Sequence, residues 1–367
     1  MRLRVISTSL AAVCLFASSG RAAAQETGRA LYGDACAACH GEDGRGEISQ
    51  SVAFDSALPD FTDCSFATRE ADADWLAVVH DGGPARSFAE MMPAFGDALS
   101  EEEIGHIIGH IRTFCREHGW PPGELNLPRP LITEKAYPED EAVLSGDIAL
   151  QDPRAVMSTL LYERRIGSRT QLELIVPFGL RRPESAGARG PWTGGLGDIA
   201  LGIKRVLWFA PDAGTIVSAA AEAKFPTGSA ERGFGAGTTV LEPFLLVGQS
   251  LPASSFLQAQ AGVELPLNRR IAAQEAFWRG ALGTTVVEGR FGRSWTPMVE
   301  LLGARDLVSG ARVQWDVVPQ IQISLNTRQH VLASIGARIP ADGSARNREL
   351  LMYLLWDWFD GGLFDGW

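Results

Sequence analysis

Cys36-Ala37-Ala38-Cys39-His40 is the stretch that decides the fold of the N-terminal part of the chain. Two thiols two residues apart add across the two vinyl groups of one haem, and the imidazole of the next residue reaches the iron. A bare C-x-x-C also suits a redox dithiol, but the histidine directly after it favours haem attachment. The sequence therefore predicts one covalent haem c, held by Cys36 and Cys39, with His40 as an axial ligand of the iron.

A methionine loop, Met91-Met92-Pro93-Ala94-Phe95, begins 51 residues after His40. A thioether opposite the imidazole is the usual sixth ligand of a cytochrome c, and it raises the reduction potential. Proline restricts the loop, and Met92 directly precedes it, so Met92 is predicted as the second axial ligand in preference to Met91. The alternatives are that both methionines are core residues or that a second histidine binds the iron.

A helix is predicted after the methionine loop. Ser100 with Glu103 three residues later has the pattern of a capping box. Four isoleucines then recur at helical spacing and form one apolar stripe, Ile104, Ile107, Ile108 and Ile111. We expect this stripe to pack on a first helix over residues 26–37 and to close the haem crevice.

Four further histidines lie in this part of the chain. His106 and His110 are four residues apart on the predicted helix, which is the spacing of a metal pair, but solvated or core histidines at such positions are more common. His80 and His118 are weaker candidates. We therefore assign no metal site to these four side chains.

The first 24 residues have the pattern of a secretory signal peptide. Arg2 and Arg4 precede a mostly apolar run over residues 5–16, and small residues at 22–24 suit cleavage before Gln25. The alternative is a buried N-terminal helix. Export implies an oxidising compartment, in which a disulfide between the remaining cysteines, Cys64 and Cys115, is favoured over two free thiols.

The composition excludes some classes of function. The formal net charge is −11, which argues against a nucleic-acid partner, because such proteins present a basic face. After the N-terminus there is no run of about 20 apolar residues, so no transmembrane helix is predicted.

Residues 25–122 resemble the class I cytochrome c domain. The resemblance is carried by C-x-x-C-H, by the M-P-A-F loop and by the capped helix that follows. It implies a small all-α fold whose His/Met-ligated haem transfers one electron. Because both axial positions are filled, it implies an electron-transfer protein rather than a substrate-converting enzyme.

A proline-rich stretch separates this domain from the rest of the chain. Prolines cluster at 121–122 and again at 128–130. Such a segment is expected to be extended and semi-rigid. Residues 123–135 are therefore predicted to be a linker between two domains.

Residues 136–367 alternate between apolar and polar positions. In 257–265 the odd positions are apolar or small, whereas Gln258, Gln260 and Glu264 occupy even positions. A period of two indicates strands with one apolar and one polar face. About a dozen such segments, with long polar connections at 181–194 and 228–237, are typical of an antiparallel up-and-down outer-membrane β-barrel. A water-soluble β-sandwich would alternate in the same way, but with its apolar face inward.

Ionisable residues on one face of several strands favour the barrel, because a lumen can solvate them: Glu222, Lys224, Glu264, Asp316 and Arg338. The last predicted strand, 350–358, is apolar on both faces. Trp356, Trp358 and Trp367 are candidates for an interfacial aromatic girdle.

Three stretches resemble a family of phenol-degradation (MetA-pathway-like) outer-membrane barrels: 194–202, 223–228 and 354–359. That family is linked to uptake or metabolism of aromatic compounds. The whole chain resembles, in plan, the cytochrome–porin fusions that oxidise iron outside the cell.

These patterns lead to two hypotheses. In the first, a haem domain at the periplasmic mouth of an outer-membrane barrel exchanges electrons with periplasmic carrier proteins, and the barrel anchors it in lipid or admits a small-molecule or metal-ion partner. A folded domain is too large for a lumen of about twelve strands, so we expect the haem outside the barrel. In the second, the barrel is a channel for small, aromatic solutes, and the haem domain is a gate or redox sensor. A soluble periplasmic carrier is the remaining alternative.

Overall fold

The computed structural model describes residues 23–46, 58–88, 90–151, 154–182, 184–185, 188–288 and 293–357. The predicted signal peptide lies almost wholly outside these residues, as do Trp358 and Trp367. The chain divides into two compact units, with the boundary between Trp120 and Pro121. Each unit is described by itself.

The first unit is helical. A helix covers residues 23–35 and is followed by five short or medium elements: α2 (Ala37–His40), α4 (Cys64–Ala67), α5 (Asp72–Asp81), η1 (Gly83–Arg86) and α6 (Glu101–Ile111). The predicted capping box is confirmed, since the Ser100 hydroxyl accepts from the Glu103 amide and the Glu103 carboxylate accepts from the Ser100 amide. Among the described residues, no helix is long and apolar enough to cross a membrane.

The helix over 23–35 crosses α6 at close range. A Cβ added at Gly28 would lie 2.1 Å from the carbonyl oxygen of His106, so only glycine fits there. Tyr32 is buried, and its ring meets the edges of His110 and Phe114, each with centroids 5.3 Å away. The expectation that the isoleucine stripe packs on the first helix is confirmed, because Tyr32 shares one apolar cluster with Ile107 and Ile111.

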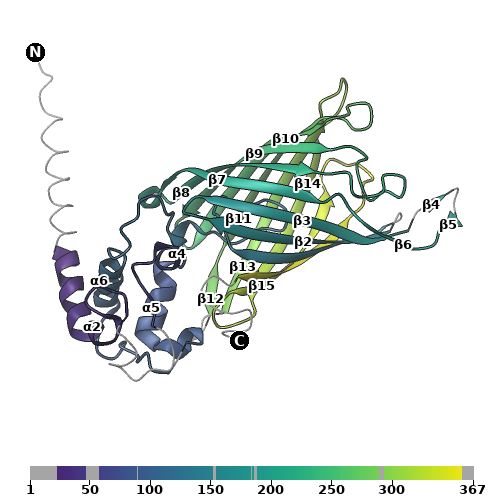
Figure 1. Ribbon diagram of the computed structural model, residues 1–367. Helices are drawn as coiled ribbons and strands as arrows, with labels where there is room; N and C mark the ends of the chain where they lie inside the picture. The colour runs from purple at the N-terminus through teal and green to yellow at the C-terminus, as the bar shows by residue number, and fades with distance from the viewer. Residues whose placement is uncertain are drawn as a thin grey trace, which may run out of the picture. The chain divides into compact units, whose positions relative to one another are not determined.

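The second unit is a closed antiparallel β-barrel (Figure 1). In the described residues twelve strands form its wall, and β1 pairs with β16 while β11 pairs with both β10 and β13. The strands are β1 (Glu141–Ala149), β2 (Ala155–Ile166), β3 (Thr170–Arg181), β7 (Ala200–Ala210), β8 (Thr215–Lys224), β9 (Val240–Leu251), β10 (Ser255–Pro266), β11 (Glu275–Thr284) continued by β12 (Val286–Glu288), β13 (Arg293–Asp306), β14 (Gln314–Ser324), β15 (Val331–Pro340) and β16 (Glu349–Asp357). The predicted fold class is confirmed.

The two ends of the barrel differ. At the end where β1 begins and β16 stops, the connections are short, for example 167–169 between β2 and β3 and 252–254 between β9 and β10. At the other end they are longer, and the loop over 182–199 contains three short strands, β4 (Glu184–Ser185), β5 (Ala188–Arg189) and β6 (Thr193–Leu196). Short turns at one end and longer loops at the other are typical of outer-membrane barrels.

The outer wall is apolar and the inner wall is largely polar. On β3, Gln171 and Glu173 are 0% and 5% exposed, whereas Leu172 and Leu174 between them are 43% and 40% exposed. The same alternation runs through β10, where Leu257 faces out and Gln258 faces in. This is the arrangement of a barrel in lipid and the reverse of a water-soluble sandwich, whose exterior would be polar.

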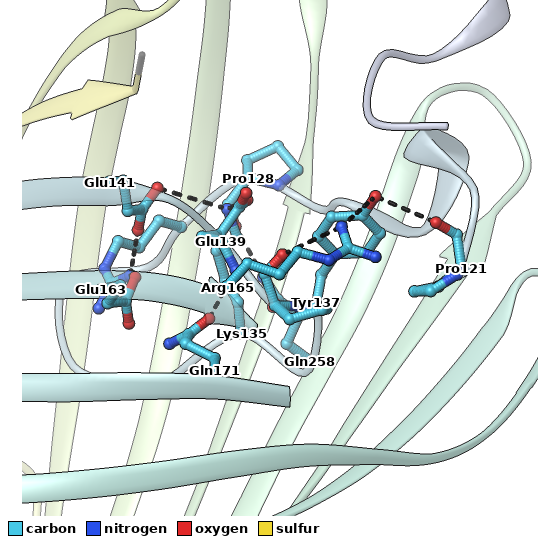
Figure 2. Close-up of polar contacts among 12 residues, drawn as sticks. Pro121, Pro128, Lys135, Tyr137, Glu139, Glu141, Glu163, Arg165, Gln171 and Gln258 are labelled. Carbon is cyan, nitrogen blue, oxygen red and sulfur yellow. Dashed lines mark hydrogen bonds and ion pairs between the residues drawn. The ribbon is translucent and has the colours of Figure 1, made fainter. Parts of the chain in front are cut away.

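The predicted linker is part of the barrel. Residues 121–140, here called the plug segment, enter the lumen at the short-turn end. Their backbone is hydrogen-bonded to side chains of eight strands: β2, β3, β8, β9, β10, β13, β14 and β16. The Tyr137 hydroxyl donates to the carbonyl of Pro121 at 3.1 Å, so the segment enters and leaves at one place (Figure 2). The sequence predicted a semi-rigid spacer at 123–135; the structure instead places this stretch inside the barrel.

Candidate functional site

The predicted haem-binding residues lie on one turn of helix. The amide of His40 donates to the carbonyl of Cys36 at 2.9 Å, so Cys36, Cys39 and His40 follow helical spacing and share one side of α2. Gly41 ends the helix with φ +75°, a backbone conformation that favours glycine. The buried Tyr32 hydroxyl donates to the Gly41 carbonyl at 2.7 Å, which ties the end of the motif to the first helix.

The chemical state of this turn suits haem attachment better than a redox dithiol. Cys36 and Cys39 are free thiols, and burial, with Cys39 as the second cause, raises the pKa of the Cys36 thiol to about 11. A redox dithiol needs a lowered thiol pKa. Burial also lowers the pKa of His40, which keeps its imidazole in the neutral form that binds metals.

Met92 faces the apolar interior of the helical unit. Its side chain packs against the cluster of Val79, Ile104 and Ile108. Met91 instead is 46% exposed. This contrast supports Met92 as the proposed sixth ligand.

The residues present fit a haem c. Two free thiols, a neutral imidazole and an inward-facing thioether form the donor set that such a haem requires. The buried Nδ1 atom of His40 has no hydrogen-bond partner among the described residues, and its ring stacks on Phe61 with centroids 5.0 Å apart. When bound there, the haem would supply one-electron chemistry.

Two further cysteines and two of the other histidines make structural contacts in the helical unit. Cys64 and Cys115 form a disulfide with Cα atoms 5.0 Å apart, which ties α4 to the residues that follow α6. His110 is 7% exposed and packs between Tyr32 and Phe114, and His80 lies 3.0 Å from Asp81. Within the described ranges, none of the histidines belongs to a cluster of three metal-ligating side chains.

A second group of buried polar side chains fills the lumen of the barrel. Glu300, in the middle of β13, is 0% exposed and accepts hydrogen bonds from the amides of Ile132 and Thr133 at 3.1 and 2.6 Å. It also accepts from the Thr133 hydroxyl at 2.6 Å and from the Gln320 amide. One carboxylate therefore holds the tip of the plug segment halfway along the barrel.

The base of the plug segment is held by charge. The Arg129 guanidinium bridges Glu141 and Glu163, at 3.0 Å from the latter, and both carboxylates are 1% exposed (Figure 2). Lys135 pairs with Glu139 in the same network. Removing one partner of such a buried ion pair destabilises a protein by several kcal/mol.

Apolar contacts complete the closure of the lumen. Phe244 and Leu246 of β9 point inward and pack on Leu125, Ala136 and Tyr137 of the plug segment. These inward-facing apolar residues were not predicted from the sequence. The available signal was that β9 carries large apolar residues on both faces, which a water-filled lumen does not need.

Comparison with known proteins agrees with the prediction made for the first unit. Residues 23–111 match the family model described as cytochrome C oxidase, cbb3-type, subunit III. The first unit therefore contains a cytochrome c-type domain, and such a domain implies haem c. No curated protein matches the chain.

Among solved structures, the KdgM porin is 10% identical with a TM-score of 0.40, and the match covers 59% of this chain and 99% of that one. The COG4313 outer membrane channel from Pseudomonas putida F1 is 13% identical with a TM-score of 0.43, covering 59% and 94%. The β domain of the Bordetella autotransporter BrkA is 12% identical with a TM-score of 0.35, covering 59% and 97%. Similarity at these identities and TM-scores gives no information about activity.

Proposed function

We propose that this protein is an electron-transfer cytochrome anchored in the outer membrane by a barrel that its own chain closes. A single covalent haem, held by Cys36 and Cys39 and ligated by His40 and Met92, exchanges one electron at a time at the periplasmic face. The proposal rests on one observation: the same chain contains a cytochrome c-type unit and a barrel with an apolar exterior and a filled lumen.

The location follows from the barrel. Its exposed outer surface is made of large apolar side chains, which need lipid around them. The plug segment leaves the lumen at the short-turn end, which in outer-membrane barrels faces the periplasm. The haem domain is attached to that end, so its partners are periplasmic.

The charge of the haem domain indicates the kind of partner. Residues 25–120 contain 18 acidic and 6 basic side chains, whereas residues 121–367 contain 26 and 24. The acidic excess of the whole chain therefore belongs to the haem domain. Such a field attracts cationic proteins and speeds their encounter at low salt. We propose basic periplasmic electron carriers as the partners.

A channel for small solutes is the second candidate. The polar and ionisable inner wall favours it, because such residues line aqueous lumens. The plug segment opposes it, because its backbone is bonded to many of those residues. A conducting state therefore requires that the segment leave the lumen.

A visible spectrum of the outer-membrane fraction, oxidised and reduced, tests the first candidate. We expect a Soret band that remains with the denatured protein after organic extraction, which shows covalent haem, and a band of methionine-ligated ferric haem that Met92→Ala removes. Extractable haem, or haem protein that stays in solution without detergent, contradicts the proposal.

A further inference from the structure

Three carboxylates meet where the plug segment touches the barrel wall. Glu134 comes from the plug segment, Glu173 from β3 and Glu222 from β8, and one oxygen of each lies within 4.8 Å of the others. Glu173 and Glu222 are 5% and 7% exposed. Three negative charges at this distance from one another, away from solvent, repel strongly unless something neutralises them.

The wall has no side chain between two of these residues. Gly202 of β7 pairs with Glu173 on one side and with Glu222 on the other, so it lies between them in the sheet. A Cβ added at Gly202 would lie 2.7 Å from Oε2 of Glu173. The missing side chain therefore leaves space that the Glu173 carboxylate occupies.

The nearby basic side chains pair with Glu173 or with carboxylates outside the cluster. The Nζ atom of Lys204 lies 3.5 Å from Glu173 and 3.9 Å from Glu163. Lys224 bonds to Glu242 and, at 3.0 Å, to Glu264. Within the described ranges, neither Glu134 nor Glu222 has an ion pair.

The Glu222 side chain also has no hydrogen bond in the part of the chain that the structure describes, although Glu222 is only 7% exposed. Oε2 of Glu134 is fully buried and likewise has no hydrogen-bond partner there. A buried carboxylate that is charged and unpaired is unfavourable. Glu134 and Glu222 therefore carry two negative charges without an ion pair, which match the charge of one divalent cation.

We propose that Glu134, Glu173 and Glu222 bind a hard divalent cation, with Ca²⁺ preferred, and that this cation fastens the plug segment to the barrel wall. All three ligands are carboxylate oxygens, which suit Ca²⁺ and not the softer metals that prefer histidine or cysteine. Oxygens around one Ca²⁺ lie at most about 5 Å apart, twice the metal–oxygen distance. Mg²⁺ needs a more regular octahedron than these three side chains offer.

The proposal makes the closure of the barrel dependent on a cation. Because Glu134 belongs to the plug segment and the other two ligands belong to the wall, the cation joins two parts that are otherwise held by hydrogen bonds and ion pairs. Its removal restores the repulsion among the three carboxylates. The plug segment is then expected to leave the lumen more often.

Titration of CaCl₂ into the chelator-treated, full-length haem protein in detergent tests the site. We expect one Ca²⁺ per chain. Glu134→Gln and Glu222→Gln should each weaken Ca²⁺ binding by at least about tenfold. Mutation of a residue that only supports a metal ligand already lowers metal affinity by that factor. Glu264→Gln is the matched control: that carboxylate also faces the lumen, but Lys224 neutralises it, so binding should persist.

In lipid bilayers, chelator on the short-turn side should raise the conductance of the wild type and leave that of Glu134→Gln unchanged. Glu134 lies on the plug segment and not on a strand, so this variant keeps the test open if Glu222→Gln fails to assemble. The absence of saturable Ca²⁺ binding in the wild type, as expected for a shared proton only, overturns the proposal. So does equal binding by wild type and Glu134→Gln.

Discussion

Glu300→Ala is expected to open the barrel. Three hydrogen bonds join this carboxylate to the plug segment, from the amides of Ile132 and Thr133 and from the Thr133 hydroxyl. A hydrogen bond to a charged acceptor contributes about 1.5–3 kcal/mol. We take the low end, because water in the opened lumen can satisfy the released donors. The loss for three such bonds is then about 4.5 kcal/mol.

A loss of about 4.5 kcal/mol changes the ratio of closed to open plug by roughly two thousandfold. In planar bilayers we therefore expect wild-type protein to conduct rarely and Glu300→Ala to conduct for much of the time. Glu300→Gln should fall between them, because an amide oxygen keeps one acceptor but loses the charge.

Asp306→Ala is the matched control for this prediction. Asp306 is an acidic residue at the end of the same strand and, within the described residues, has no hydrogen bond or ion pair with the plug segment, so its loss should leave conductance at the wild-type level. The reasoning is refuted if wild type conducts as freely as Glu300→Ala, or if Glu300→Ala stays as closed as the control. In the first case the plug segment does not block the lumen, and in the second Glu300 does not hold it.

Three further predictions concern the haem domain. Met92→Ala should keep the covalent haem but lower its reduction potential and let added imidazole bind the iron, whereas His40→Ala should remove the native ligation; redox titration and ligand-binding spectra check both. Replacing both Cys64 and Cys115 by serine should destabilise the haem domain by about 4 kcal/mol, the loop-closure value for a sequence separation of 51, measured as an earlier loss of the methionine-ligated spectrum in denaturant. Reduction of the haem by cationic hexaammineruthenium should slow as salt rises from 0.01 to about 0.15 M, because salt screens the acidic surface that attracts the reagent. Reduction by anionic ferrocyanide should not slow. Stopped-flow rates that are equal for both reagents at low salt contradict the proposal that the acidic surface attracts cations.

Local sequence patterns predicted the strands and the haem-attachment motif. On β10 the alternation of Leu257 and Gln258 gave both the strand and its faces, because a period of two is a property of the strand itself. Cys36 to His40 are adjacent in the chain, so their chemistry needed no tertiary information. The choice between lipid and water for the apolar face did need the structure, since alternation is the same in both cases.

The plug segment could not be predicted in the same way. Thr133 and Glu300 are 167 residues apart, and nothing in either local pattern pairs them. Proline content predicted an extended segment but not its surroundings. Leu125 and Leu127 were a usable sign that this segment is buried, because a solvated spacer does not need large apolar residues. Together with the inward-facing Phe244, they are explained only when the segment fills the lumen.

The filled lumen limits how electrons can reach the haem. The hydrocarbon layer is about 30 Å thick, and one haem on one side cannot carry an electron across it. An external donor would have to pass through the barrel, where Glu300 and Arg129 hold the plug segment in place. Donor and acceptor are therefore both expected on the periplasmic side while the plug is closed. If the protein does exchange electrons with an external donor, the rate of that exchange should rise in Glu300→Ala. The plug segment, and not the haem, would then decide whether the donor is periplasmic or external.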